Sequence, residues 1–526
     1  MSLVNIPTHP ISLHYKRTRQ VFINSIAILL LFQVTVAQNS KGKIIDFATK
    51  ESIPYASIMV NNTDHLVSNA EGHFTLSEGN SKDDTVLSIS YLGYLSQVLT
   101  VGQLKKLDFT IALAPSVFEL DDVTINTKKP NPYEIMASVK ANLNRNYKDD
   151  GLPSKDLLFY RKSNNFKPKE IEVEINKSTG FSKQALIKVN TDIQTFSKQL
   201  ITNPPVEFSD LLGNLYTCST KKDGKYFSLN KLDVLKATKL DRDGSSFSTE
   251  ELKKVALNKI LQHLDSTKYY RVKSGLFGSR DTISLRKEFN QRKRKNKIKE
   301  ANPLLTSTKF SLNRFLVDNH LLFSSQFYFI KKTELYDYTY EGTTYTEDNE
   351  SAYILTFKPR SSKAKYVGKI YISETDFAVL RVEYTLDSGE KLNSFNLKLL
   401  LGVKAAENIS KGTIIYKKKA NGNGYYLQYA TIERGQYFYV NRPLKFIELS
   451  SGEKDVLSLD IKIEGSSSEK TEFLNMSHSM TTESTIEKLT ESEFKFINIK
   501  SYDPKIWKGY NTIEPLEELK RLQSIN

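Results

Sequence analysis

Residues 366–387 read YVGKIYISETDFAVLRVEYTLD, and this stretch decides the fold. Two runs rich in β-branched and aromatic residues, 368–373 and 378–387, flank a turn, and such side chains suit a pleated, half-buried surface. Upstream, Tyr336-Asp337-Tyr338-Thr339-Tyr340 alternates aromatic and polar residues, which indicates a strand with one face on a core and the other in water. The pattern predicts antiparallel strands of a large sheet.

Similar runs recur throughout the C-terminal part of the chain. Their connections are short and rich in Gly, Asn, Asp or Ser, as in Asn421-Gly422-Asn423-Gly424, which favours a sequential antiparallel meander over parallel crossovers. The predicted strands are 323–330, 333–340, 352–358, 368–373, 378–387, 396–401, 413–419, 425–434 and 457–463. We expect a mainly β domain with a curled or half-barrel sheet and helices near 133–147, 248–265 and 514–522.

The N-terminal part of the chain is a separate β-rich segment. Short β runs at 43–46, 56–60, 73–76, 85–91 and 108–113 alternate with turn residues. Such even spacing predicts a small antiparallel β-sandwich.

The residues of this segment resemble a known family. The matching residues are Gly42, Ile44, Asp46, Thr49, Ile53, Pro54, Ala56, Val60, Thr63, Glu71, Gly72, Phe74, Leu76 and Ser90-Tyr91-Leu92-Gly93-Tyr94. Together they are similar to the carboxypeptidase regulatory-like domain, a transthyretin-like sandwich. The resemblance implies that fold and a setting in the Gram-negative cell envelope, and it implies no peptidase activity, because this accessory domain carries no catalytic residues.

Weaker resemblances concern the rest of the chain. Residues 120–125 resemble the segment that follows this module in TonB-dependent receptors, but Lys128-Lys129-Pro130-Asn131-Pro132 breaks the chain and no plug or barrel follows. The helix near 133–147 and residues 158–161 look like exported proteins of unassigned activity that place this module before a large β-rich domain. Residues 366–384 are similar to half-barrel proteins that carry lipoproteins across the periplasm, so a lipid-binding concavity is an alternative to a filled core.

The chain begins with a basic leader and an apolar run. Lys16, Arg17 and Arg19 precede the apolar residues 26–32, and Thr35-Val36-Ala37 follows as a small-residue cleavage site. This order is typical of a secretory signal peptide, predicted over 1–37. A retained anchor is the alternative, although the apolar run 21–37 is shorter than the ~20 residues that span a bilayer.

Composition and charge narrow the class of protein. Of the 526 residues, 39% are hydrophobic and 11% aromatic, which suffices for packed cores rather than disorder. The net charge is +15, and after export the available polyanions are lipid head groups, lipopolysaccharide and acidic glycans rather than nucleic acid. The single cysteine, Cys218, allows no internal disulfide and is expected to be a buried or incidental thiol.

The sequence contains no recognisable catalytic or metal motif. Beyond the leader, the histidines show no HExxH spacing, so zinc hydrolysis is not expected, and no GxSxG elbow or P-loop occurs. Asp241-Arg242-Asp243-Gly244 with Glu250 partly fits a calcium loop, but Lys239 stands at the first ligand position, so a surface turn is favoured. A hydrolase with dispersed catalytic residues stays an alternative.

Two stretches are candidates for partner binding. Arg292, Lys293, Arg294 and Lys295 open the densest basic run, 292–299, which lacks aromatic residues for base stacking; a solvated loop is favoured there, and contact with an anionic surface is the functional alternative. Trp507, the only tryptophan, lies near Tyr510. This pair either docks the C-terminal segment, which is favoured, or forms a partner-binding hot spot.

The sequence thus predicts a signal peptide at 1–37, a carboxypeptidase regulatory-like sandwich at 38–114, a linker at 115–131 and a large antiparallel β-rich domain at 132–526. We expect a non-catalytic binding or scaffolding protein, exported to the periplasm or outer membrane, with no cofactor. Its expected partner is an envelope protein or an anionic surface of lipid, lipopolysaccharide or glycan, with peripheral outer-membrane association and no nucleic acid. The alternatives are a lipid or lipoprotein carrier and a hydrolase.

Overall fold

The structure is a computed structural model that describes residues 40–117, 129–222, 225–240, 264, 267–275, 277–284, 303–449 and 453–521. Five predictions lie outside these residues: the leader at 1–37, most of the linker at 115–131, the helix at 248–265 except Leu264, the loop at 241–250 and the basic run at 292–299. Each helix within the described ranges is too short or too polar to cross a bilayer.

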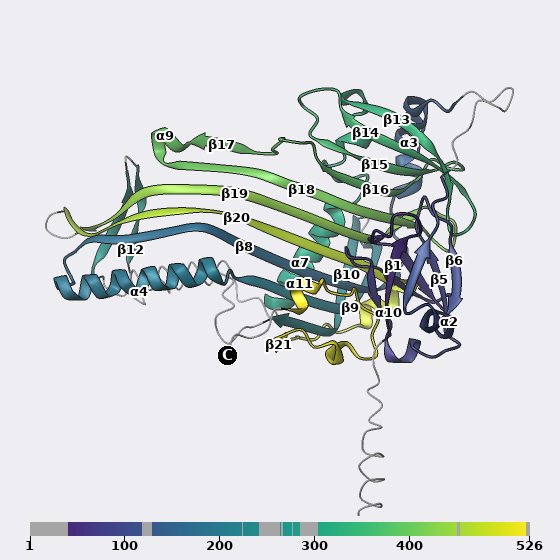
Figure 1. The fold of residues 1–526 in the computed structure, drawn as a ribbon, viewed down its shortest axis with the longest axis horizontal. Helices are drawn as coiled ribbons and strands as arrows, with labels where there is room; N and C mark the ends of the chain where they lie inside the picture. The colour runs from purple at the N-terminus through teal and green to yellow at the C-terminus, as the bar shows by residue number, and fades with distance from the viewer. Residues whose placement is uncertain are drawn as a thin grey trace, which may run out of the picture.

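Residues 41–113 form a small β-sandwich (Figure 1). One sheet contains β4 (His73–Thr75), β1 (Lys41–Asp46) and β7 (Thr110–Leu113), and the other contains β3 (Asp64–Val67), β2 (Ser57–Val60), β5 (Val86–Ser90) and β6 (Gln97–Thr100). Alternate side chains, such as Ile44, Ile58 and Ile89, fill the space between the sheets. The expected all-antiparallel pairing is wrong in one place: β1 and β7 run parallel, because helix α2 (Val101–Lys106) carries the chain from one sheet to the other.

The second sheet contains 14 strands among the described residues. Its path is β13-β14-β15-β16-β18-β19-β20-β8-β9-β10-β21; β17 pairs with β18, and the β11–β12 hairpin pairs with β19. The strands are β8 (Ser154–Ser178), β9 (Val206–Lys222), β10 (Lys225–Leu240), β11 (Tyr269–Ser274), β12 (Phe277–Ser284), β13 (Tyr336–Tyr345), β14 (Ser351–Pro359), β15 (Tyr366–Ser373), β16 (Val379–Leu386), β17 (Ser394–Leu397), β18 (Val403–Lys418), β19 (Tyr425–Leu449), β20 (Glu453–Met480) and β21 (Ile497–Ile499). The pairs are antiparallel as predicted, except β10 with β21.

Helices cover one face of this sheet and make it curl. They are α3 (Pro132–Tyr147), α7 (Pro303–Asp318) and α8 (Tyr328–Lys331). A single core cluster joins Phe315 of α7 to Tyr338 of β13 near one edge and to Leu232 of β10 near the other. Strands far apart in the sheet can share a core only if the sheet curves around the helices, and the helices fill much of the concavity.

Two predicted elements are wrong, and a third, the strand at 396–401, is wrong in part. The strand predicted at 323–330 is a turn followed by α8. Its aromatic residues Phe327 and Phe329 are fully buried in the core. An apolar run without alternation does not distinguish these structures. The helix predicted at 514–522 shrinks to α11 (Glu517–Lys520), because Pro515 disfavours helical backbone at Glu514.

Several elements have no counterpart in the prediction. Strands β9 and β10 and helices α4 (Lys183–Thr202) and α7 lie in the stretch between 183 and 318. Residues 396–401, predicted as one strand, divide into the end of β17 and helix α9 (Lys398–Leu401). The remaining short elements are α10 (Glu483–Lys488), η1 (Glu78–Asn80), η2 (Thr333–Leu335) and η3 (Pro504–Trp507).

The sandwich packs directly on the large sheet. The Tyr55 ring lies 5.4 Å from that of Tyr429, and the Gly93 amide donates to Thr344 Oγ1 at 3.0 Å. The C-terminal segment adds a second set of contacts, in which Asn69 Nδ2 donates to the Pro515 carbonyl at 3.3 Å. Buried polar bonds of this kind fix one docking geometry, so the sandwich and the sheet have a defined arrangement.

Candidate functional site

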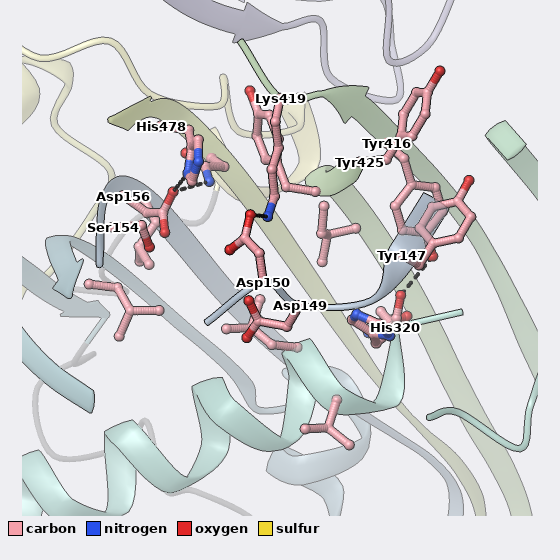
Figure 2. Close-up of a pocket in the computed structure, with 18 of the residues that line it drawn as sticks. Tyr147, Asp149, Asp150, Ser154, Asp156, His320, Tyr416, Lys419, Tyr425 and His478 are labelled. Carbon is pink, nitrogen blue, oxygen red and sulfur yellow. Dashed lines mark hydrogen bonds and ion pairs between the residues drawn. The ribbon is translucent and has the colours of Figure 1, made fainter. Parts of the chain in front are cut away.

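A cavity of about 300 Å³ lies where β8 begins and where α3, α7 and β20 end (Figure 2). We call this cavity the end pocket. Its charged, amide, imidazole and serine lining residues are Lys148, Asp149, Asp150, Ser154, Asp156, Asn319, His320, Lys419, Asn475 and His478.

Strand register and one tight loop bring these residues together. The start of β8 pairs with the end of β20, so that Asp156 stands opposite His478. Helix α3 ends at Tyr147, and Gly151, at φ +70°, turns the chain into β8. This turn places the carboxylates of Asp149 and Asp150 at the mouth of the cavity (Figure 2).

A histidine–carboxylate–amide network forms one wall. His478 Nδ1 lies 2.6 Å from Asp156 Oδ1, and the same oxygen accepts from Asn475 Nδ2 at 2.8 Å. The Tyr426 ring stacks on the His478 ring at 4.8 Å. Asn475 is 4% exposed, and its Oδ1 has no hydrogen-bond partner among the described residues. A buried acceptor of this kind needs a donor, and no described residue supplies one.

An ion pair stands at the mouth. Lys419 Nζ lies 2.9 Å from Asp150 Oδ2, and the Leu152 amide donates to Asp150 Oδ1 at 3.1 Å. Burial alone would raise the pKa of Asp150, but these two donors hold it below its usual value. Asp150 is therefore a carboxylate at neutral pH.

His320 is structural rather than a free base. Burial lowers the pKa of His320, so the ring is neutral at neutral pH. Its Nδ1 accepts from the Leu322 amide at 3.2 Å, and the ring also hydrogen-bonds the backbone of Tyr147 (Figure 2). Of the two histidines that line the end pocket, His478 is the one hydrogen-bonded to a carboxylate, that of Asp156.

The opposite wall is aromatic and fixed in place. Tyr147 donates to the Val379 carbonyl and Tyr416 to the Asn319 carbonyl, both at 2.7 Å. Burial raises the pKa of both phenols well above the usual value, so they stay protonated. Leu158, Leu215, Leu316 and Phe473 add apolar lining. A largely apolar cavity with a few convergent polar groups is typical of a small-molecule site, and its volume is at the lower end of the usual range.

The structure places the residues predicted for partner binding as follows. Trp507 is 3% exposed and packs edge-on against Phe159 at 5.7 Å, so its indole does not lie on the surface; Tyr510 is 39% exposed. Neither residue lines the end pocket. Arg292, Lys293, Arg294 and Lys295 lie outside the described residues. Cys218 is buried, and burial raises the pKa of its thiol.

One group of side chains has the spacing of a metal site within the described ranges: Glu71, His73 and Glu517. Lys520 pairs with Glu517 there and also lies 2.6 Å from Glu514 Oε1. This ammonium already supplies a positive charge to the carboxylates, so we assign no metal to the group.

Comparisons with known proteins identify only the N-terminal part. A model of the CarboxypepD_reg-like domain matches residues 40–125. No curated protein matches the chain. A DUF1329 family protein from Desulfovibrio piger is 11% identical, with a TM-score of 0.19 over 64% of this chain and 93% of its own. MucB in the Pseudomonas aeruginosa MucA/MucB complex is 6% identical, with a TM-score of 0.14 over 63% and 93%. We infer nothing about fold or function from scores this low. Residues 40–125 therefore carry a CarboxypepD_reg-like domain, and this match does not extend into the large β-rich region that follows.

Proposed function

We propose that this protein is a non-catalytic binding protein of the cell envelope and that its end pocket takes a neutral sugar or an amino sugar. The envelope setting rests on the leader at 1–37 and on the resemblance of the sandwich to envelope modules. The binding role rests on one observation, the buried and unpartnered Oδ1 of Asn475 in the wall of a cavity.

The chemistry of the lining selects the class of ligand. Asp149, Asp150, Asp156 and Asn475 present oxygen acceptors, which favour a ligand rich in O–H or N–H donors, while Lys148 and Lys419 add positive charge to the lining. The Tyr425 and Tyr426 rings also line the end pocket, and the His478 ring covers one face of Tyr426. A sugar combines hydroxyl donors with an apolar C–H face, so it matches both parts of the lining.

Native mass spectrometry of the protein purified from its own host tests this proposal. We expect a bound species of saccharide mass that is lost in the Asn475→Leu variant. The matched control is Asn164→Leu, because Asn164 also donates to a carboxylate, Glu207, and also has an unpartnered Oδ1, but lies outside the end pocket. Retention of the species by Asn475→Leu, or a bound acyl chain in its place, would contradict the proposal; an acyl chain would instead support the carrier alternative.

Hydrolysis is the second candidate, and the Asp156–His478 pair is the observation that favours it. A carboxylate that holds Nδ1 of a histidine leaves Nε2 to act as a general base toward water. Ser154, the one serine among the described residues that line the end pocket, is hydrogen-bonded to Thr217 Oγ1 at 3.0 Å, so a serine nucleophile is less well supported. Chromatography can detect monosaccharides released from an oligosaccharide. Their release by the wild type but not by His478→Gln would establish hydrolysis in place of simple binding.

A further inference from the structure

The far end of the large sheet carries an unusually exposed apolar segment. Figure 1 shows β17 and α9 at the end of the long strands β18, β19 and β20, away from the sandwich. In this segment, Leu399 is 100% exposed and Leu400 81%, while Phe395 and Leu397 are 52% and 39% exposed. We call residues 395–400 the leucine tip.

The leucines are held outward by a fixed backbone. The Asn441 amide of β19 donates to the Gly402 carbonyl at 2.7 Å, next to the tip. Gly402 has φ +64°, and a Cβ there would lie 1.9 Å from the Asn441 oxygen, so this close approach requires glycine. Leu397 of β17 pairs with Val403 of β18 across the turn. The exposure is therefore built into the hairpin.

The hairpin that carries the leucine tip is basic, and Glu464 of β20 lies near enough to Lys398 to interact with it electrostatically. From Lys391 to Lys404 the chain has three lysines and no acidic residue. Lys398 lies within the tip, and its ammonium stands 4.1 Å from the centre of the Tyr439 ring. Exposed apolar side chains in a segment with three lysines match a surface with negative head groups above an apolar interior.

We propose that the leucine tip inserts into the interface of a lipid bilayer with anionic head groups, with the leucines among the acyl chains and the lysines at the phosphates. Tight packing in the folded protein does not require these side chains, since water surrounds Leu399 completely. Full burial of a leucine strengthens binding by ~10–100-fold. Two leucines on a rigid turn thus supply a peripheral contact with the membrane. Added salt should weaken the contribution of the lysines to this binding, but not that of the leucines.

Vesicle co-sedimentation tests the proposal. We expect the protein to bind vesicles of phosphatidylethanolamine and phosphatidylglycerol, and to bind phosphatidylcholine vesicles more weakly. Leu399→Ser with Leu400→Ser should reduce the bound fraction at least ~10-fold. The control is Val98→Ser, because Val98 is 70% exposed but lies in β6 of the sandwich. Each variant has the same length, so any contribution of the leader is equal in all of them.

The same variants distinguish other occupants of the tip. Unaltered thermal unfolding of the double variant is expected and confirms that it is folded. Equal vesicle binding by wild type and double variant, or no binding by either, would overturn the proposal. So would a concentration-dependent dimer in water that the double variant abolishes, because the tip would then join two copies of this chain.

Lys391→Gln with Lys404→Gln should reduce binding to the anionic vesicles and leave the weaker binding to phosphatidylcholine unchanged.

Discussion

At the scale of single residues, burial decides which charges matter. Arg161 is 1% exposed and makes two hydrogen bonds to the buried Asp210, at 2.7 and 2.9 Å. Its guanidinium also lies 5.1 and 4.9 Å from the rings of Phe159 and Phe208. Removing one partner of such a pair leaves a buried charge without compensation.

We therefore predict that Arg161→Leu lowers the free energy of unfolding by about 3–5 kcal/mol. Urea denaturation of the purified variant measures this change. The matched control is Arg360→Leu, because Arg360 also lies 2.7 Å from a carboxylate, that of Asp337, but both side chains are exposed. The Arg360→Leu control should lower the free energy of unfolding by less than about 1 kcal/mol. Equal losses in the two variants would show that burial is not the cause.

A second residue-scale prediction concerns pH. Burial and the nearby Lys417 ammonium lower the pKa of His65 to about 4, against a weaker opposite effect of Glu347. Between about pH 6.5 and 4, His65 is protonated in the unfolded chain, where its pKa is about 6.5, but not in the folded chain. The free energy of unfolding therefore decreases as the pH falls from about 6.5 to 4. His65→Gln should flatten the dependence of the unfolding free energy on pH in this window. A slope as steep as that of the wild type would contradict the assignment.

The residues of the end pocket illustrate what local sequence patterns can and cannot reveal. Asp149-Asp150-Gly151 after the predicted helix could have suggested polar residues at a turn. Asp156 and His478 are 322 positions apart, and their contact depends on the register of β8 against β20. Register is set by the whole hydrophobic pattern of both strands and by their bulges. No local sequence motif therefore predicts the contact between Asp156 and His478.

At the scale of elements, the hairpins and the covering helix α3 were predictable, whereas the covering helices α4 and α7 were not. Residues 366–387 form β15 and β16 as expected, because alternation and turn residues act locally. Helix α4 presents only a partly buried stripe, including Leu186, Val189 and Ile193, and this stripe packs on β8, which precedes it, in a cluster that also includes residues of β19 and β20. Its stability comes from that tertiary contact, which the local sequence does not display.

The C-terminal segment contains an element-scale prediction. Thr75 of β4 donates to Glu514, which is 2% exposed, so this bond joins the segment to the sandwich in a buried place. A double-mutant cycle with Thr75→Val and Glu514→Gln should give a coupling energy of about 1–3 kcal/mol. Lys508 and Glu78 join the same two parts at 3.0 Å but are about half exposed, and the cycle there should give less than about 1 kcal/mol. Comparable values for both pairs would refute the role given to the buried contact.

At the scale of the whole molecule, two surfaces lie at different places on one curled sheet. The end pocket lies where the helices that fill the sheet meet the ends of β8 and β20, and the leucine tip stands on the hairpin of β17 and β18. The sandwich is docked beside the sheet by contacts such as that of Arg381 Nη2 with the Tyr91 hydroxyl at 3.0 Å. This arrangement suits a protein that rests on a membrane by one end and offers a ligand pocket at another.

The central claim is that the end pocket binds a donor-rich ligand through Asn475, and titration calorimetry with N-acetylglucosamine and its disaccharide tests it most directly. The wild type and Asn164→Leu should bind, and Asn475→Leu should bind ~10–100-fold more weakly, because one ligand hydrogen bond to a buried group is lost. Equal affinity of Asn475→Leu and the wild type, or no heat of binding with any of these sugars, would contradict the account.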